Sequence, residues 1–233
     1  MANNNIDSLQ KIIGVRFKDQ SLLQKALVHR SFLNELPGKK LSSNERLEFL
    51  GDAVLSYVIS KWLYQDYPDY PEGHLTNIRS NLVKTESLAE IAQNLKIGDY
   101  LLLSKGEEKS GGRNNHSLLA NTFEAIIGAI TLDQGIDVVD RLIRARLLAR
   151  LRKTIKSGEF KEYKSVLQEK LQAKIKQSPV YKTVKEEGPD HAKTFTIGAY
   201  AQGKLIATGT GKNKKGAEEA AAKNALEKIG PKG

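Results

Sequence analysis

Apolar residues recur at helical spacing along the first two thirds of the chain, from Ile6 to about Leu151. In the runs at 22–27 and 54–63, they return after three or four positions, as on one face of a helix. The spacing predicts an all-helical region. Its loops are expected where polar residues, glycine and proline collect, at 36–43, 67–73 and 104–117.

The pattern changes after Tyr163, where helical spacing gives way to alternation and to β-branched residues. We expect the order helix, three strands, helix, with the elements at 165–175, 179–187, 193–202, 205–211 and 217–229. A charged, glycine-containing stretch without a clear apolar face separates the two patterns. The prediction is therefore a domain at 1–153, a linker at 154–160 and a second domain at 161–233.

Composition narrows the classes of protein that fit. The chain has 233 residues, 39% of them hydrophobic, which is enough for packed cores. It has no cysteine and only four dispersed histidines, so a thiolate or histidine-cluster metal site is excluded. No apolar run reaches 18 residues and no secretory signal begins the chain, so we expect a cytoplasmic protein without membrane spans.

The net charge of +10 suggests a polyanionic partner, and its distribution is uneven. Residues 161–233 carry a net charge of +7, whereas 1–160 carry +3. Within the tail, Lys212, Lys214 and Lys215 lie just before or within the first turn of the last expected helix. Cations there oppose the helix dipole, but a bound phosphate would favour them. A solvated lysine run is the simpler alternative.

Acidic residues interrupt the apolar pattern in NERLEFLGDAVL, residues 44–55. Glu45, Glu48 and Asp52 are separated by three, four and seven positions, which places them on one helical face. Carboxylates at this spacing repel one another, and partial burial adds a desolvation cost. The arrangement requires raised pKa values or a bound cation, although Glu45 alone is equally consistent with a helix cap or an ion pair.

A second acid occupies an apolar segment, LLANTFEAIIGAITLD at 118–133. If this helix packs against the helix at 44–63, with Gly51 and Gly128 allowing close approach, oxygen-bearing side chains from both helices meet. These are Glu48, Asp52, Asn121 and Glu124. Oxygen ligands without soft donors favour Mg²⁺ or Mn²⁺ over zinc. A surface charge is the alternative for any one of these acids, but each lies too far inside its helix to be a cap.

The motif NERLEFLGDAVL, with ALVHRSF at 26–32, EGHLTNIRSNLV at 72–83 and LLANTFEAIIGAITLD, resembles the catalytic domain of bacterial ribonuclease III. The tail resembles the double-stranded-RNA-binding domain of the same family. The resemblance implies an all-α endonuclease domain followed by a small α+β domain of order α-β-β-β-α. It also implies a homodimeric, Mg²⁺-dependent endoribonuclease that cuts duplex RNA by a metal-activated water, leaving 5′-phosphate and 3′-hydroxyl ends, in rRNA and mRNA processing.

By this resemblance, Glu48, Asp52 and Glu124 match the metal-binding acids of the family, with Asp52 and Glu124 also catalytic. Asn121 stands where the family pattern usually has aspartate, which removes one negative charge but keeps an oxygen ligand. A catalytically silent duplex-RNA-binding protein is therefore the alternative function. Glu45 and Glu72 match positions near the acidic cluster and the RNA-facing surface, and are secondary candidates.

The same resemblance assigns RNA contacts in the tail to Gln168, Glu169, His191, Lys212, Lys214 and Lys215. Such domains recognise the shape and the 2′-hydroxyls of A-form RNA. His29 has the spacing of a hydrogen-bonded structural histidine, which we favour over a catalytic base. Lys105, Lys109 and Arg113 are available to phosphate, as cations in any exposed loop are. The apolar face that contains Phe49 and Leu50 is available to a dimer interface or to the core.

Overall fold

The structure is a computed structural model that describes residues 6–36, 41–157, 163–189 and 193–230. The chain divides into two compact units, residues 1–160 and 161–233, which are considered separately. The predicted linker begins too early, because residues 154–157 continue the last helix of the first unit. Thr154 is buried there, and its hydroxyl donates to the side-chain oxygen of Asn81 at 3.4 Å.

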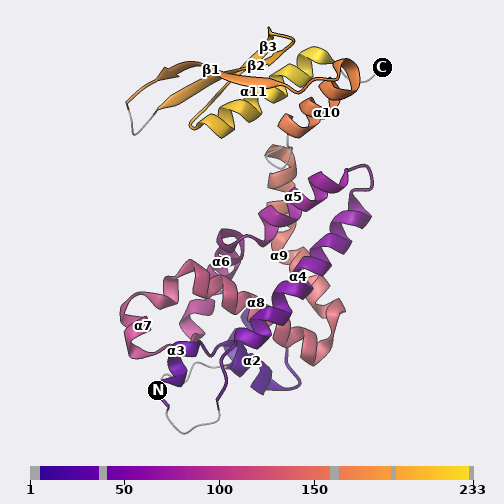
Figure 1. Cartoon of the computed structure of the whole chain (residues 1–233). Helices are drawn as coiled ribbons and strands as arrows, with labels where there is room; N and C mark the ends of the chain where they lie inside the picture. The colour runs from indigo at the N-terminus through magenta and orange to yellow at the C-terminus, as the bar shows by residue number, and fades with distance from the viewer. Residues whose placement is uncertain (1–5, 37–40, 158–162, 190–192, 231–233) are drawn as a thin grey trace. The chain divides into compact units, whose positions relative to one another are not determined.

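The first unit is helical, as its apolar spacing predicts (Figure 1). Its elements are α1 (Ile6–Ile13), α2 (Gln20–Ala26), α3 (Arg30–Leu33), α4 (Glu45–Asp66), α5 (Glu72–Val83), α6 (Thr85–Asn94), the 3-10 helix η1 (Ile97–Tyr100), α7 (Lys105–Lys109), the 3-10 helix η2 (Gly112–Asn114), α8 (His116–Gln134) and α9 (Ile136–Ser157).

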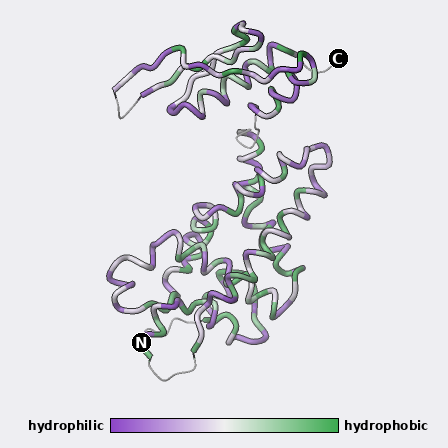
Figure 2. The backbone as a smooth tube through the Cα atoms, viewed as in Figure 1, coloured by the Kyte–Doolittle hydropathy of each residue, from purple (hydrophilic) through white to green (hydrophobic). Residues whose placement is uncertain are grey.

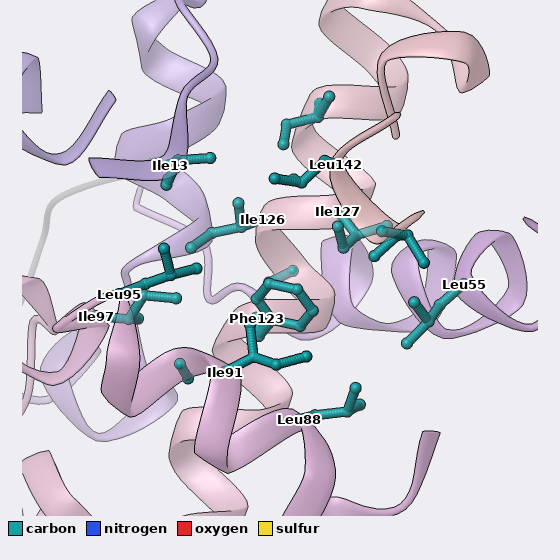
Figure 3. Close-up of a cluster of buried hydrophobic side chains, with 14 of the residues drawn as sticks. Ile13, Leu55, Leu88, Ile91, Leu95, Ile97, Phe123, Ile126, Ile127 and Leu142 are labelled. Carbon is teal, nitrogen blue, oxygen red and sulfur yellow. The ribbon is translucent and has the colours of Figure 1, made fainter. Parts of the chain in front are cut away.

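The core of this unit forms around α8, whose inner turns are buried nearly all the way round. Phe123, Ile126 and Ile127 of α8 contact apolar side chains from α1, α4, α6 and α9 (Figure 3). Apolar residues on the tube of Figure 2 gather where these helices meet, and polar residues follow the outer faces. Burial of this kind is the main favourable term in folding, and it fixes the position of α4 against α8.

The segment at 104–117, expected to be a loop, contains the short helices α7 and η2. Ser104 caps α7 by accepting a hydrogen bond from the backbone N–H of Glu107. Arg113 donates from Nη1 to the carbonyl oxygens of Gly98, Asp99 and Leu101, at 2.9, 3.3 and 3.1 Å. Arg113 thus holds this segment onto η1, a structural role that the sequence pattern did not indicate.

The second unit has the predicted order α10 (Tyr163–Ile175), β1 (Val180–Glu187), β2 (Thr194–Ala201), β3 (Lys204–Gly211) and α11 (Lys214–Ile229). The strands form an antiparallel sheet of order β1-β2-β3, with Ile197 of β2 opposite Thr183 and Gly209. Both helices pack on the sheet through a small core rich in alanine. At Gly209, an added Cβ would lie 2.1 Å from the backbone nitrogen of Ala221, so α11 approaches β3 directly.

In the part of the chain that the structure describes, no helix is both long and apolar enough to cross a membrane.

Candidate active site

The helices α4 and α8 cross in backbone contact, and two glycines make this approach possible. A Cβ added at Gly51 would lie 1.8 Å from the carbonyl oxygen of Glu124, and one added at Gly128 would lie 2.2 Å from that of Leu47. No side chain larger than hydrogen fits at either position. The crossing that the sequence suggested therefore exists, and it brings the acidic turns of the two helices together.

A pocket of about 530 Å³ opens beside this crossing. The four metal-binding residues predicted from the sequence line it together: Glu48, Asp52, Asn121 and Glu124. Its remaining lining comes from the same two helices and from the segment between α2 and α4: His29, Arg30, Asn44, Glu45, Phe49, Leu118 and Thr122. Two helices far apart in the sequence thus contribute acids to one cavity.

The electrostatics of the pocket show the cost of placing these acids together. Burial, together with the nearby carboxylates of Asp52 and Glu48, raises the pKa of Glu124 to about 7. Burial also raises the pKa of Glu48, with smaller contributions from Glu45 and Asp52. Each shift reflects a carboxylate that is harder to ionise than in water. A cation placed among them would relieve the repulsion.

The donors in the pocket are three carboxylates and an amide, which is a set suited to a hard divalent cation such as Mg²⁺. As their side chains lie, however, no three Asp, Glu, His or Cys residues within the described ranges are arranged to hold one ion. Asn121 carries an amide, so it is not one of these four residue types. The residues fit a hard cation by their chemistry and their shared pocket, and the structure supplies no coordination geometry.

The two secondary acidic candidates have different environments. Glu45 begins α4 at the rim of the pocket, where it accepts a hydrogen bond from Ser43 Oγ at 2.7 Å and lies 3.8 Å from Arg30. Glu72 begins α5 and accepts a hydrogen bond from Thr76 at 2.8 Å. Glu72 does not line the acidic pocket, so the structure brings together only one of these two residues with the main acids.

His29 has the structural role expected from its spacing, and it also borders the pocket. It is the N-cap of α3, where its Nδ1 lies 2.8 Å from Ser31 Oγ. Burial lowers its pKa, while Glu107 raises it and Arg30 lowers it. Arg30 was missed from the sequence. His29, the residue before Arg30, was noted in the sequence. The position of this segment depends on an isolated β-bridge between Val28 and Leu102, which no periodic sequence pattern reveals.

In the second unit, the predicted RNA-contacting residues lie on two elements. Gln168 and Glu169 are exposed on α10. Lys212 precedes α11, and Lys214 and Lys215 form its first turn; all three are exposed. Asn213 caps α11 by accepting from the backbone N–H of Gly216 at 2.8 Å, which orients this turn. His191 lies outside the described residues.

Lys214 has a partner that the sequence did not indicate. Its ammonium group lies 3.2 Å from Glu186 at the end of β1 and 5.6 Å from the ring centroid of Phe195. The hydrogen bond from Lys214 lowers the pKa of Glu186. The contact joins the first turn of α11 to the edge of the sheet, so the lysine is positioned even without a nucleic acid.

Comparison with known proteins gives matches over both units. The model of a family described as Ribonuclease-III-like matches residues 19–151, and that of the double-stranded RNA binding motif matches residues 163–229. A curated protein named Ribonuclease 3 from Syntrophobacter fumaroxidans is 46% identical, covering 97% of this chain and 96% of the relative. Another of that name, from Enterococcus faecalis, is 44% identical, covering 98% of this chain and 99% of the relative.

Among solved structures, the nuclease domain of ribonuclease III from Campylobacter jejuni is similar, with a TM-score of 0.56 and 42% sequence identity. The match covers 61% of this chain and 98% of that one, and the structure is described as flexible in a region involved in dimer formation.

Proposed function

The chain belongs to the ribonuclease III family, and from this premise we propose that its acidic pocket hydrolyses duplex RNA with the help of Mg²⁺. Family membership makes it a double-stranded-RNA endoribonuclease. The observation that carries the proposal is the shared pocket on α4 and α8, where Glu124 has a pKa near 7 beside two further carboxylates.

Glu48, Asp52 and Glu124 would hold the cation through carboxylate oxygens, and Asn121 through its amide oxygen. When bound, Mg²⁺ neutralises these carboxylates, lowers the pKa of a water molecule and withdraws charge from the phosphate; Mn²⁺ can take its place. A neutral amide at 121 weakens the attraction for the cation without removing the ligand atom. The three acids retain the chemistry that the site requires.

The protein groups have roles of their own in this mechanism. Without a cation the pKa of Glu124 is about 7, and a bound cation would favour its ionised form, so Glu124 would serve as a carboxylate that accepts a hydrogen bond from the attacking water. Asp52 is the second residue to which we assign catalysis, because it lies one residue from the glycine contact that brings α4 to Glu124. Arg30, at the rim, offers a cation to the RNA backbone.

A homodimer is part of the proposal, because one acidic pocket cuts one strand and two related by a two-fold axis cut both. The outer face of α4 carries large exposed side chains: Phe49 is 81% exposed, Tyr64 76% and Tyr57 55%. Leu50 is half-buried. Exposed aromatic residues in a row are typical of an interface. Phe49 also lines the acidic pocket, so a second copy bound to this face would lie next to the site.

In the second unit, α10 and the first turn of α11 would contact successive grooves of the duplex, through Gln168, Glu169, Lys212, Lys214 and Lys215. His191, outside the described residues, remains a further candidate. The natural substrates we propose are structured regions of ribosomal and messenger RNA, and the compartment is the cytoplasm.

The proposal is tested by incubating the chain with a labelled RNA duplex and Mg²⁺, beside Asn121→Asp and Glu124→Gln. The native chain and Asn121→Asp should cut both strands and leave 5′-phosphates. Glu124→Gln should bind the duplex with native affinity, because the change lies in the pocket of the first unit, and should cut at least about a hundredfold more slowly.

The alternative function, a silent duplex-RNA-binding protein, makes a different prediction for the same assay. In that case neither the native chain nor Asn121→Asp cuts with Mg²⁺ or Mn²⁺, while both bind the duplex. Cutting by Asn121→Asp alone would identify the amide as the cause of silence, since that substitution restores the missing negative charge.

A further inference from the structure

The helix α9 is strongly basic, and the proposed catalysis uses none of its charge. Its cationic residues are Arg141, Arg144, Arg146, Arg150, Arg152, Lys153 and Lys156. Three of these have structural partners: Arg144 pairs with two aspartates, Arg146 donates to carbonyl oxygens at the end of α1, and Arg150 pairs with Glu90. Structural pairing therefore accounts for only part of the charge on this helix.

A second pocket, of about 420 Å³, lies between the later turns of α9 and the junction of α5 with α6. These helices lie beside one another in the first unit (Figure 1). The charged residues that line the pocket are Lys84, Glu90, Arg146, Arg150 and Lys153. Four cationic residues and one acid line it, although the Arg146 guanidinium is held by α1; the acid-rich pocket on α4 and α8 shares no residue with it.

The first turn of α6 adds to the positive potential of this pocket. α6 spans ten residues, and its N-cap, Lys84, makes no side-chain capping hydrogen bond. Lys84 and Ser87, at the N-cap and the third helical position, both line the pocket. The dipole of α6 favours an anion at this end, and so do the lysine and arginine side chains around it.

The pairing of Arg150 with Glu90 leaves part of the Arg150 guanidinium group without a hydrogen-bond partner. Its Nη1 donates to Glu90 at 2.6 Å, but its Nε is buried and has no hydrogen-bond partner. Among the described residues, the hydroxyl of Tyr181 is the one other buried side-chain polar atom in that condition. A guanidinium group has five N–H donors arranged to meet two oxygens of one anion, and Glu90, 64% exposed, satisfies it in part.

From these observations we propose that the pocket between α9 and α6 binds a phosphate group. Arg150, Lys153 and Lys84 would contact its oxygens, beside the N-terminal end of α6. The phosphate belongs either to the backbone of a bound RNA or to a free phosphate compound, since both offer the same oxygens. The inference uses no catalytic step, so it stands or falls separately from the proposed function.

Isothermal titration of inorganic phosphate into the full chain, without metal or RNA, tests the site. The pocket variant Arg150→Gln with Lys153→Gln is compared with Arg152→Gln with Lys156→Gln, which removes two charges from the same helix outside the pocket. The pocket variant should bind phosphate about tenfold more weakly than the control, because charge-assisted hydrogen bonds are lost. Circular dichroism checks that both variants fold.

A parallel titration with duplex RNA distinguishes the two sources. If the site holds an RNA phosphate, the pocket variant loses more RNA affinity and more salt dependence than the control, and inorganic phosphate competes with the duplex. If it holds a free phosphate, the two variants bind RNA equally. Equal phosphate affinity in the two variants, or no saturable binding by the native chain, overturns the proposal. Should the first variant unfold, Lys84→Gln with Lys153→Gln leaves the pair of Arg150 with Glu90 intact and tests the same point.

Discussion

Replacing Gly51 by alanine adds one methyl group where α4 touches α8. The new Cβ would lie 1.8 Å from the carbonyl oxygen of Glu124, whereas ordinary contact begins near 3.4 Å, so the helices must separate by about 1.6 Å. The obstacle is backbone and cannot rotate away. Gly73, the second residue of α5, offers a matched control, because a Cβ there has nothing within 4 Å.

The magnitude follows from the packing on either side of the contact. A gap of 0.5–1 Å already removes about a quarter to a half of the dispersion energy between facing atoms, and α8 lies at the centre of the core. Overpacking of this kind commonly costs about 1–3 kcal/mol, and we expect about 3 kcal/mol or more for a backbone contact. Gly73→Ala should leave the unfolding free energy unchanged or raise it by up to about 1 kcal/mol.

Urea unfolding followed by tryptophan fluorescence measures this difference in the intact chain. Trp62 is the single tryptophan of the sequence and is buried in α4, so its signal reports on the first unit alone. With a slope of about 2 kcal/mol per molar urea, Gly51→Ala should lower the midpoint by about 1.5 M at a fixed protein concentration. A midpoint equal to that of Gly73→Ala would show that α4 and α8 are not in backbone contact.

Three further predictions concern charge, RNA and assembly. The pKa of Glu124 is raised from 4.5 to about 7 in the folded chain, so between these two pH values the side chain is ionised in the unfolded chain but still protonated in the folded one. In the absence of metal, the free energy of unfolding should therefore fall as the pH rises from 4.5 to about 7. The melting temperature of Glu124→Gln, relative to that of the native chain, should therefore rise between pH 4 and 8. If the difference between the two melting temperatures does not change with pH, the raised pKa of Glu124 is refuted. Lys214→Ala with Lys215→Ala should weaken duplex binding and reduce the slope of log binding constant against log salt concentration by about one to two. An unchanged melting temperature serves as the control for folding. An unchanged slope would show that neither lysine contacts the RNA. Phe49→Ser should raise the dimer dissociation constant at least about tenfold by sedimentation, and native-like assembly would exclude this face.

The elements predicted from the sequence are those whose apolar spacing reports on burial. The ends of the strands were placed within one residue, because alternation and β-branched residues mark β1 to β3 in the sequence. The segment around α7 carries no such pattern. Its helix depends on the cap at Ser104 and on hydrogen bonds from Arg113 to a distant turn. The last turn of α9 was likewise missed, since the burial of Thr154 depends on a neighbour on α5.

The candidate site shows the same division. Glu48, Asp52, Asn121 and Glu124 were expected to meet because polar groups within apolar helices are visible in the sequence and the glycines indicated that the helices cross, and the four do line one pocket. Arg30 was not recognised, because its place at the rim depends on tertiary contacts of a short connecting segment. Glu186, the ion-pair partner of Lys214, was missed for a similar reason. The two residues meet because the end of β1 lies next to the start of α11 in the folded unit.

The close crossing of α4 and α8 also explains why the acidic residues are costly. Burial is the largest cause of the raised pKa of Glu124, and that burial exists because the two glycines let the helices touch. A looser crossing would admit water, lower the pKa of Glu124 and reduce the need for a cation. The same contact therefore stabilises the first unit and keeps its carboxylates buried and close together, where a divalent cation would reduce their mutual repulsion. Stability and metal affinity should accordingly fall together in Gly51→Ala, whereas a change confined to the acids separates them.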